Sequence, residues 1–409
     1  MNLAYSLLVS TVWFLSIYFV VVFLLILIFK KNELFTSPKT RKDNFPKVSL
    51  VISAWNEEKT IADSIKSLNK IDYPKDKIEI VIVNDGSKDN TSKIVRQNLQ
   101  DNIIFIDNKV NKGKAACLNQ GILKATGELV ACMDADSEVS PDAIKKLIPY
   151  FDDKKMGAVT VAVRVKNPKN FLEKILDIEY IIGLSLSLKA LSFLNAVHVT
   201  PGPFSIYSRD ALIKIGMFDA TNMTEDLEIA YRFQKHGYKI DNCTTTKVWT
   251  ITPNTFKSLY KQRKRWYTGA LITLKQHKDV IFNKERGTFG FVVPYTYILI
   301  ALGLFLFYYA AGLSLYNMYK TVTYYWLTNF NFHWVFDFDM LSINSLTFLG
   351  ISSILATVTS AAICLKLSKQ RITSKLLGMF GYVFIFFMYQ VFWTASFYSF
   401  IFGRKVKWR

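Results

Sequence analysis

Apolar residues gather in four long stretches that carry no charged side chain. One stretch lies near the amino terminus and three follow residue 287: Leu7–Phe29, Thr288–Tyr319, Leu341–Leu365 and Leu376–Gly403. A helix needs about 20 residues to cross the hydrocarbon core of a bilayer, and each stretch is at least that long. The pattern therefore predicts one membrane helix before a more polar middle segment and about three after it.

The middle segment alternates short apolar runs with polar turns and amphipathic helical repeats. Four of the apolar runs are predicted strands: Val48–Ala54, Ile78–Asn84, Ile103–Asp107 and Glu128–Met133. Continuous apolar strands separated by such helices are typical of a mostly parallel sheet with both faces covered. The predicted fold class is therefore an α/β, Rossmann-like domain combined with α-helical transmembrane segments.

Residues 170–194 form a further apolar stretch inside this middle segment. Charged side chains interrupt it at helical spacing, among them Lys174, Asp177, Glu179 and Lys189. We therefore predict a helix that packs on the sheet or lies near the membrane, and not a fifth crossing.

The cations that flank the first apolar stretch indicate how the chain is oriented. They follow the stretch instead of preceding it, and a small-residue cleavage site is missing, so a retained anchor is favoured over a signal peptide. Positive-inside bias then places Lys30, Lys31, Arg41 and Lys42 in the cytoplasm. The predicted organisation is a membrane anchor over residues 1–30, a cytosolic domain over 31–286 and a membrane domain over 287–409. Residues 254–286 are expected to form interfacial helices.

The predicted number of crossings conflicts with the charge of the carboxyl-terminal tail. Three crossings after a cytosolic domain would place Arg404, Lys405, Lys407 and Arg409 outside, against the positive-inside rule. Three alternatives remain open: the last apolar stretch dips in and returns, a short crossing lies near Tyr324–Phe336, or the tail is outside.

Charge and cysteine content agree with a membrane protein whose central domain is cytosolic. The chain has 51 Lys and Arg against 32 Asp and Glu, a formal net charge of +19, which favours the inner leaflet. Four cysteines show no CxxC spacing and no histidine partners, so we expect reduced, buried thiols and neither a disulfide framework nor a zinc site. They are Cys117, Cys132, Cys243 and Cys364.

Polar side chains follow three of the predicted strands. Asn56 and Glu57 follow the first strand, Asp85 follows the second, and Asp134 and Asp136 follow the fourth. In parallel α/β sheets ligands bind outside the carboxyl ends of the strands. Each motif alone reads as an ordinary turn, but three on one edge indicate a binding site.

The sequence Asp134-Ala135-Asp136 is the most informative of these motifs. An extended backbone directs both carboxylates to one side, where they repel each other unless a cation or a proton intervenes. A site with few protein oxygen ligands, in which substrate phosphates supply further ligands, suits Mg²⁺ or Mn²⁺. The alternative is a helix cap for the segment after residue 141, but Ser140 is better placed for that role.

Two predicted helix starts carry further candidates. Lys114 follows Gly113 at the start of a helix, where free N–H groups attract anions, although the spacing of a P-loop is absent. Thr224 is a predicted N-cap, and, taken alone, Glu225 and Asp226 after it are better explained as acids that favour the helix dipole.

Residues 260–269, YKQRKRWYTG, form the densest cationic run, with Lys261, Arg263, Lys264 and Arg265. An anionic membrane surface, a nucleic acid and a bound phosphate group are competing ligands for it. A solvated charged face is the simplest alternative.

Six short motifs together resemble the family 2 glycosyltransferases, in particular the processive membrane synthases of cellulose, chitin, hyaluronan and poly-N-acetylglucosamine. They are SAWNEEKT, VNDGSKDNT, NKGKAACLN, MDADS, MTEDLE and KQRKRW, in this order and between membrane helices. The resemblance covers roughly Val48–Trp266 and the flanking helices. Because the DxD, TED and QxxRW motifs must agree in order and spacing, the resemblance is specific, and it implies a GT-A-like fold.

The resemblance implies roles for individual residues on the donor side. Asp85 would recognise the uridine of a UDP-sugar, with Asn56 and Glu57 lining the nucleotide. Asp134 and Asp136 would hold the diphosphate, Asp136 through Mg²⁺ or Mn²⁺. The remaining implied nucleotide-sugar contacts are Lys114, Gln262, Arg263 and Arg265, the two arginines gripping the pyrophosphate.

On the acceptor side the resemblance implies that Asp226 is the general base and that Trp266 is the platform under the acceptor sugar, with Glu225 beside it. Direct displacement by a hydroxyl group would invert the anomeric centre, so an α-linked donor would give a β-linked product. Phosphate then becomes the expected ligand of Arg263 and Arg265, and nucleic acid is not expected as a partner.

Three functions remain to be separated at this stage. The first is an enzyme of the cell membrane that extends and extrudes a β-linked polysaccharide, with UDP-N-acetylglucosamine as the expected donor. The second is a transferase that moves one sugar to a lipid. The third is a membrane protein that binds nucleotide or polymer without catalysis. The small number of membrane helices also raises the prospect of a small partner subunit.

Overall fold

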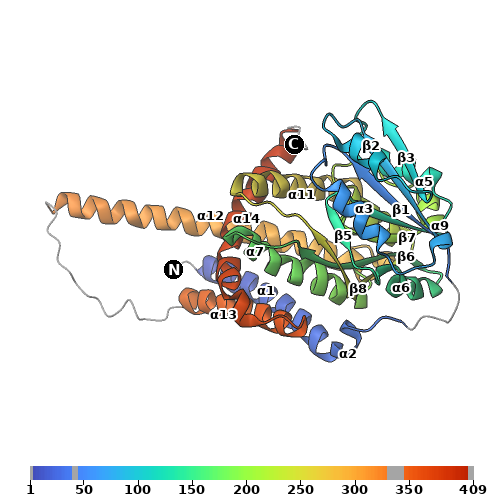
Figure 1. Ribbon diagram of the computed structural model, residues 1–409. Helices are drawn as coiled ribbons and strands as arrows, with labels where there is room; N and C mark the ends of the chain where they lie inside the picture. Colours follow the sequence, from blue (N-terminus) through green and yellow to red (C-terminus); the bar gives the residue numbers. More distant parts are fainter. Residues whose placement is uncertain (1–2, 39–44, 329–344, 404–409) are drawn as a thin grey trace.

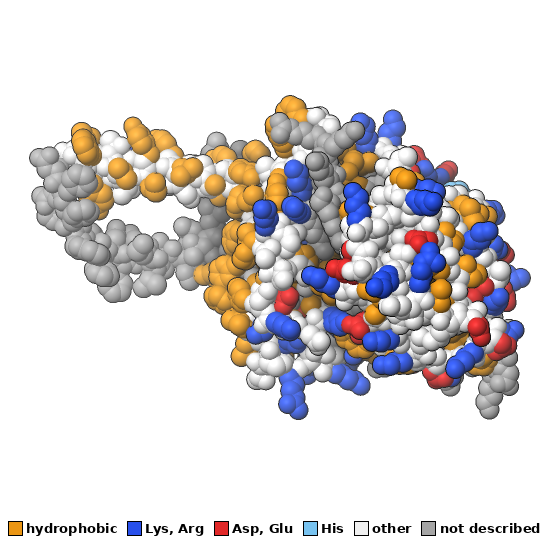
Figure 2. All heavy atoms as spheres, turned by 45° about the horizontal axis from the view of Figure 1, so that its top comes forward, with side chains coloured by type: hydrophobic (Ala, Val, Ile, Leu, Met, Phe, Trp, Pro, Cys, Tyr) orange, Lys and Arg blue, Asp and Glu red, His pale blue; other side chains and the backbone are white. Residues whose placement is uncertain are grey.

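The computed structural model describes residues 3–38, 45–328 and 345–403. Two parts are evident: an α/β domain, and a group of long helices that extends away from it (Figure 1). In Figure 2 hydrophobic side chains gather over the long helices, whereas Lys, Arg, Asp and Glu side chains lie mainly over the α/β domain. This division agrees with a polar domain attached to helices that could cross a membrane.

The α/β domain is built on an eight-stranded sheet with the order β3-β2-β1-β4-β7-β6-β8-β5. Strands β1 to β4 are mutually parallel, whereas β7 runs antiparallel to β4 and β6. The predicted mostly parallel sheet is confirmed, and the four predicted strands are present. The strand bounds are β1 Val48–Ala54, β2 Ile78–Asp85, β3 Ile103–Asn108, β4 Leu129–Asp134, β5 Ser137–Val139, β6 Met156–Val165, β7 Ser205–Ser208 and β8 Lys239–Thr250.

Helices cover both faces of this sheet because its central strands are apolar on both sides. In β1, Leu50 and Ile52 belong to one buried cluster and Val51 to the cluster on the opposite face. The covering helices are α3 Ile61–Asn69, α4 Thr91–Gln97, α5 Lys114–Lys124, α6 Ala143–Leu147, α9 Arg209–Lys214 and α10 Glu225–Lys235. Short 3₁₀ turns occupy Lys75–Lys77, Ile148–Asp152, Lys278–Val280, Lys284–Arg286 and Ile372–Lys375.

Two predicted helix caps differ from the structure. Helix α6 begins after Asp142, so Ser140 lies too far upstream to be its N-cap. Thr224 does occupy the N-cap position of α10, but its side chain accepts no capping hydrogen bond. Its hydroxyl group donates to Asn222 Oδ1 (3.1 Å) instead, because the loop before the helix turns back on itself.

The predicted helix over residues 170–194 is present but is divided into three pieces. Helix α7 (Phe171–Ile181) starts with a capping box between Asn170 and Glu173, continues as a π-helical segment (Ile182–Ser187), and ends as α8 (Leu188–Phe193). The apolar face of α7 packs on the sheet, as the interrupted apolar pattern indicates.

Four long helices form the second part: α1 Leu3–Phe29, α12 Phe289–Leu327, α13 Ser345–Leu367 and α14 Leu376–Ile401. A short helix, α2 (Lys31–Leu34), follows the first of them. By length and composition all four long helices could cross a membrane. Helix α12 has 39 residues, so it is about 58 Å long and exceeds the ~30 Å hydrocarbon core. Most of the predicted short crossing near Tyr324–Phe336 and the cationic tail at 404–409 lie outside the described residues.

Helix α14 has different surroundings from the other three long helices. It runs steeply across α1, α12 and α13 (Figure 1) and follows the α/β domain along its length. Near its start, a Cβ atom on Gly378 would lie 2.7 Å from the carbonyl oxygen of Lys174 in α7. Further along, Trp393 stacks on Tyr267 with ring centroids 4.1 Å apart. Tyr267 belongs to α11 (Phe256–Gln276), the helix that carries the cationic run.

Candidate active site

The ends of three parallel strands bring the predicted donor residues to one edge of the sheet. Ser53 in β1 is in register with Asp134 at the end of β4, and Ala54 with Asn84, which precedes Asp85 at the end of β2. The strand pairing therefore places Asp85 and Asp134 on either side of the loop that follows β1.

Asp85 is buried and holds the turn that begins α5. Its two carboxylate oxygens accept hydrogen bonds from the backbone N–H groups of Lys112 (2.6 Å) and Gly113 (3.0 Å). The next residue, Gly86, has a φ of 66°, and a Cβ atom there would lie 2.8 Å from the backbone nitrogen of Asn111. Only glycine fits this close approach. Asp85 thus fixes the position of Lys114.

Asn56 and Glu57 join the loop after β1 to the loop after β2. Asn56 has a φ of 55°, its N–H donates to Ser87 Oγ (2.9 Å), and its side-chain oxygen accepts from the N–H of Lys88 (2.9 Å). The N–H of Glu57 donates to Thr91 Oγ1 (2.8 Å). These contacts connect the two loops into one wall beside the strand ends.

Lys114 is the centre of a buried group of charges. Its ammonium nitrogen lies 2.6 Å from Asp134 Oδ1 and 2.9 Å from Glu225 Oε1. Burial alone would lower the pKa of Lys114, but Asp134, Glu225 and Asp226 raise it well above its usual value, so the ammonium group stays charged. The strand end, the start of α5 and the start of α10 therefore meet at one cation.

A loop that precedes β7 closes over this group. A Cβ atom on Gly202 would lie 2.7 Å from Lys114 Nζ and 2.8 Å from Asp134 Oδ2, so a larger residue would displace the ion pair. Thr200 donates through both N–H (3.0 Å) and Oγ1 (2.9 Å) to the carbonyl oxygen of Asp226. Gly202 and Thr200 line the same small pocket as Lys114, Asp134 and Asp226.

Asp226 is placed in this pocket as a carboxyl group with a shifted pKa. Burial, together with the neighbouring charge of Glu225, raises the pKa of Asp226 to about 6, although Lys114 and Arg265 act in the opposite direction. A carboxylate of this kind accepts a proton near neutral pH more readily than an ordinary aspartate. Asp226 is therefore a candidate proton acceptor, although its Oδ1 also accepts a hydrogen bond from the N–H of Leu227 (2.9 Å), as an acid in the first turn of a helix does.

Asp136 is a half-buried carboxyl group with hydroxyl partners. Ser137 Oγ (3.1 Å) and Thr250 Oγ1 (3.2 Å) donate to it. Burial, with the charges of Asp134 and Glu57, raises its pKa to about 7. Within the described ranges no three His, Cys, Asp or Glu side chains are grouped as a metal site. The oxygen-only donors of Asp134 and Asp136 nevertheless fit a hard divalent cation whose remaining ligands are phosphate and water.

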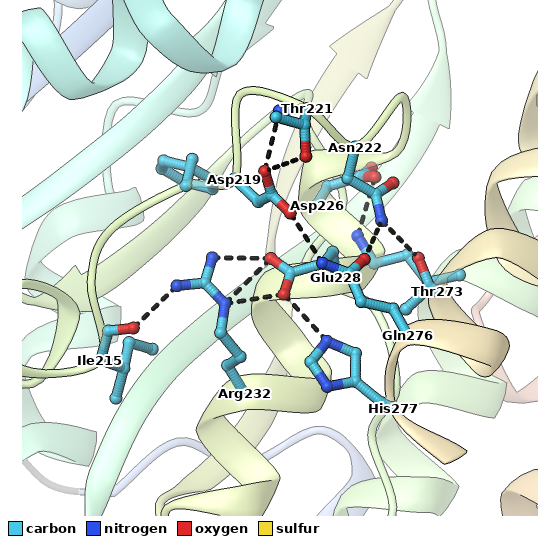
Figure 3. A network of polar contacts seen from close by, with 12 residues as sticks. Ile215, Asp219, Thr221, Asn222, Asp226, Glu228, Arg232, Thr273, Gln276 and His277 are labelled. Carbon is cyan, nitrogen blue, oxygen red and sulfur yellow. Dashed lines mark hydrogen bonds and ion pairs between the residues drawn. The ribbon is translucent and has the colours of Figure 1, made fainter.

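A polar network holds the start of α10 against α11 behind the pocket (Figure 3). The side-chain N–H groups of Asn222 donate to Thr273 Oγ1 (2.9 Å) and Gln276 Oε1 (3.1 Å). His277 Nε2 lies 2.9 Å from Glu228, which also binds Arg232. The network fixes the direction in which Glu225 and Asp226 enter the pocket.

Helix α11 presents the two predicted arginines to different neighbours. Arg265 Nη1 donates to the carbonyl oxygen of Met223 (3.4 Å), beside the start of α10. Arg263 Nη2 instead donates to Glu179 Oε2 in α7 (2.7 Å). Residues two apart on a helix are separated by roughly 200°, so the structure brings Arg265 toward the Lys114 group and does not bring Arg263 there.

The other two residues of the QxxRW motif lie near Arg263. Gln262 lies beside the hydroxyl group of Tyr180, and its Oε1 is buried without a hydrogen-bond partner among the described residues. The Arg263 guanidinium carbon lies 4.1 Å from the centroid of the Trp266 ring.

Sequence reasoning assigned no individual role to Thr200, Gly202 or Glu179 in this arrangement. The resemblance places the stretch 200–210 near the acceptor, but the sequence does not show which side chains this loop covers. Glu179 looked like one of several charges that interrupt an apolar helix.

The sheet order, the polar residues at the strand ends and the Asp-Ala-Asp sequence agree with the predicted GT-A-like fold. The four cysteines are free and buried, in agreement with the predicted burial. A solved structure of a mannosyltransferase from Pyrobaculum calidifontis, in complex with GDP-Man and Mn²⁺, has a similar fold. Its TM-score is 0.60 at 18% identity, covering 97% of this chain and 100% of that one.

Residues 49–216 match the sequence profile of glycosyl transferase family 2, so the chain contains a domain that matches this family. It is 34% identical over 234 residues to a poly-beta-1,6-N-acetyl-D-glucosamine synthase of Staphylococcus aureus, covering 57% of this chain and 56% of the relative. The synthase of the same name from Staphylococcus epidermidis is 33% identical over 260 residues, covering 63% of each. The chain thus spans less than two thirds of the length of these relatives.

Proposed function

We propose that this protein is a membrane-embedded, inverting glycosyltransferase that adds sugars from a UDP-sugar to a growing β-linked polysaccharide and helps to extrude it. UDP-N-acetylglucosamine is the proposed donor, because the related synthases carry that sugar in their names. One observation supports the chemistry most directly. A single pocket contains a cation (Lys114), a carboxylate suited to a metal (Asp134) and a carboxyl group suited to proton transfer (Asp226).

In the proposed reaction the carboxylate of Asp226 accepts the proton of the attacking acceptor hydroxyl group. The acceptor oxygen bonds to the anomeric carbon as the bond to the departing UDP oxygen breaks, and the configuration at that carbon inverts. Lys114 and Arg265 stabilise the negative charge that develops on the diphosphate. Glu225 keeps Lys114 close to Asp134 and lies beside the acceptor.

Asp134 and Asp136 are the residues that would hold Mg²⁺ or Mn²⁺ in this scheme. When bound, such a cation neutralises phosphate oxygens and so makes UDP a better leaving group. Asp85, Asn56 and Glu57 are proposed to form the nucleoside end of the donor site, since they make up the adjoining loops. Trp266 is proposed to carry the acceptor sugar.

The proposed membrane arrangement places the α/β domain in the cytoplasm, beside α1, α12 and α13 as crossing helices. Helix α14 is proposed to lie in the interface, because it contacts α7 at one end and α11 towards the other. Near its carboxyl end, Ser396 Oγ donates to the carbonyl oxygen of Lys264 (3.3 Å). Of the three predicted alternatives, this arrangement is nearest to the one in which the last apolar stretch dips into the membrane and returns. A small membrane subunit remains a proposed partner.

The decisive experiment supplies membranes that contain the protein with a panel of radiolabelled UDP-sugars and Mn²⁺ or Mg²⁺. We expect polymer from UDP-N-acetylglucosamine, UDP release in proportion to sugar incorporated, and degradation by an enzyme specific for β-linkages. A single labelled sugar on extracted lipid would contradict polymer synthesis and support a lipid transferase. Absence of UDP release with every donor would contradict catalysis altogether. Membranes with the Asp226→Asn variant are the matched control.

A further inference from the structure

A buried contact joins three helices at the junction of the α/β domain and the long helices. Glu179 of α7, Arg263 of α11 and Tyr389 of α14 meet there. Both Arg263 Nη2 and the Tyr389 hydroxyl group donate to Glu179 Oε2, each at 2.7 Å. The Arg263 side chain is only 3% exposed and that of Glu179 20% exposed. A guanidinium group this deeply buried requires its carboxylate partner.

The same guanidinium group covers one face of an indole ring. The central carbon of Arg263 lies 4.1 Å from the ring centroid of Trp266, the geometry of a stacked cation–π contact. A sugar also binds an indole by stacking on its face. The face under Arg263 is therefore occupied, and an acceptor must use the opposite face.

The contact also lies close to the donor site. Tyr180, next to Glu179 in α7, is within electrostatic range of Arg263 and of Asp136, and Gln262 lies beside its hydroxyl group. A change at Glu179 can therefore alter the position of Trp266 relative to the reacting centre without touching the residues that hold the donor.

We propose that Glu179 is a positioning residue for the acceptor platform: with Tyr389 it holds Arg263 against one face of Trp266 and so fixes the indole that carries the acceptor sugar. Arg263 then orients Trp266 and does not grip the diphosphate, which leaves that role to Arg265. This assignment rests on the proposed function for the identity of the acceptor, but the orientation of Trp266 can be measured without activity.

The chain offers a matched control on the same helix. Asp177, also in α7, forms an ion pair with Lys375 at the start of α14. Like Glu179, it is a carboxylate that ties α7 to the region of α14. Unlike Glu179, Asp177 has no hydrogen bond or ion pair with Arg263 or Trp266 in the described part of the chain; its ion pair is with Lys375. Loss of either carboxylate weakens the attachment of α14, but only loss of Glu179 should reorient the indole.

The experiment uses the full-length protein in lipid nanodiscs, with every tryptophan replaced by 5-fluorotryptophan. The ¹⁹F resonance that disappears in Trp266→Phe identifies Trp266. We expect Glu179→Gln and Arg263→Lys to shift or broaden that resonance, and Asp177→Asn to leave it unchanged. Tyr389→Phe, which removes one hydroxyl group and keeps the ion pair, is measured in the same way so that the test survives if Glu179→Gln does not fold.

Kinetics and binding provide the second readout. In Glu179→Gln the KM for an N-acetylglucosamine oligosaccharide acceptor should rise roughly tenfold, the scale of effect expected from a misplaced substrate, while UDP affinity stays within about twofold of the parent. An unchanged Trp266 resonance in folded Glu179→Gln and Tyr389→Phe would overturn the proposal, as would equal effects of Asp177→Asn. If the parent protein makes no polymer but the resonance still shifts, the proposed function fails and the positioning role of Glu179 stands.

Discussion

The edge of the sheet and the junction of α7, α11 and α14 are organised in different ways. At the edge, charged residues come from the ends of neighbouring strands and the starts of two helices, and they converge on Lys114. At the junction, charged and aromatic residues come from the interiors of three helices and converge on Arg263. The edge leaves its carboxyl groups facing a pocket, whereas the junction buries its ion pair.

This difference suggests that the sheet edge serves the donor chemistry and that the junction positions the acceptor. Backbone pairing fixes the positions of side chains at strand ends, so side chains of like charge can be held close together there. Side chains in helix interiors are held by the packing of one helix on another. A motif such as QxxRW can therefore serve both regions, because its residues point in different directions around α11.

The largest expected effect comes from Asp136→Asn, at the edge. Loss of one carboxylate charge should abolish transfer and remove the dependence of donor binding on Mn²⁺, because much of the hold on the cation is lost. Calorimetric titration of the UDP-sugar with and without Mn²⁺ measures this dependence directly. Unchanged metal dependence in the variant would contradict the assignment of Asp136 as a ligand.

Asp226→Asn should reduce transfer by ~10²–10⁴-fold, the usual range for a positioned base, and leave UDP affinity unchanged. The raised pKa of Asp226, about 6, also predicts a pH dependence in the parent protein. Below this value the carboxyl group is protonated and cannot accept a proton, so the rate should rise as the pH increases through about 6. If Asp226 acts only on the helix dipole, the variant would keep its activity and lose ~0.3–1 kcal/mol of stability.

Gly202→Ala tests whether sugar transfer requires the close packing of Lys114 and Asp134 at the sheet edge. The new methyl group would occupy space 2.7 Å from Lys114 Nζ, so Lys114 or Asp134 must move. A displacement of this size should cost on the order of 10²-fold in transfer rate. Gly183→Ala is the matched control, because nothing lies within 4 Å of a Cβ atom there, and its rate should equal that of the parent.

Trp266→Ala tests the junction and should have the smallest effect on the donor. UDP-sugar binding should stay within a few-fold of the parent, because Arg265 and Lys114 are intact. Polymer length should fall on the order of tenfold, since the stacking surface under the acceptor is lost. Gel filtration of the labelled product measures that length, and full-length polymer at the parent rate would exclude Trp266 as the platform.

The sequence by itself determined the parts of this protein that depend on local pattern. Apolar runs such as Val48–Ala54 fixed the parallel strands, and uncharged stretches such as Leu7–Phe29 fixed the long helices, because burial of such runs has few solutions. The positions of Asp85, Asp134 and Asp226 also followed, since parallel strands end at one edge and a motif keeps its order along the chain.

Tertiary structure alone decided which of these residues meet. Strand β7 pairs with β4 although β5 and β6 lie between them in sequence. This pairing brings Gly202, just before β7, over Lys114 from nearly 90 residues away in the chain (residues 114 and 202). The same applies to Glu179, Arg263 and Tyr389, which are joined only when three helices pack together. The local sequence pattern shows whether a side chain is apolar or charged. The partner of a buried charge, however, depends on the packing of segments that are distant in the sequence.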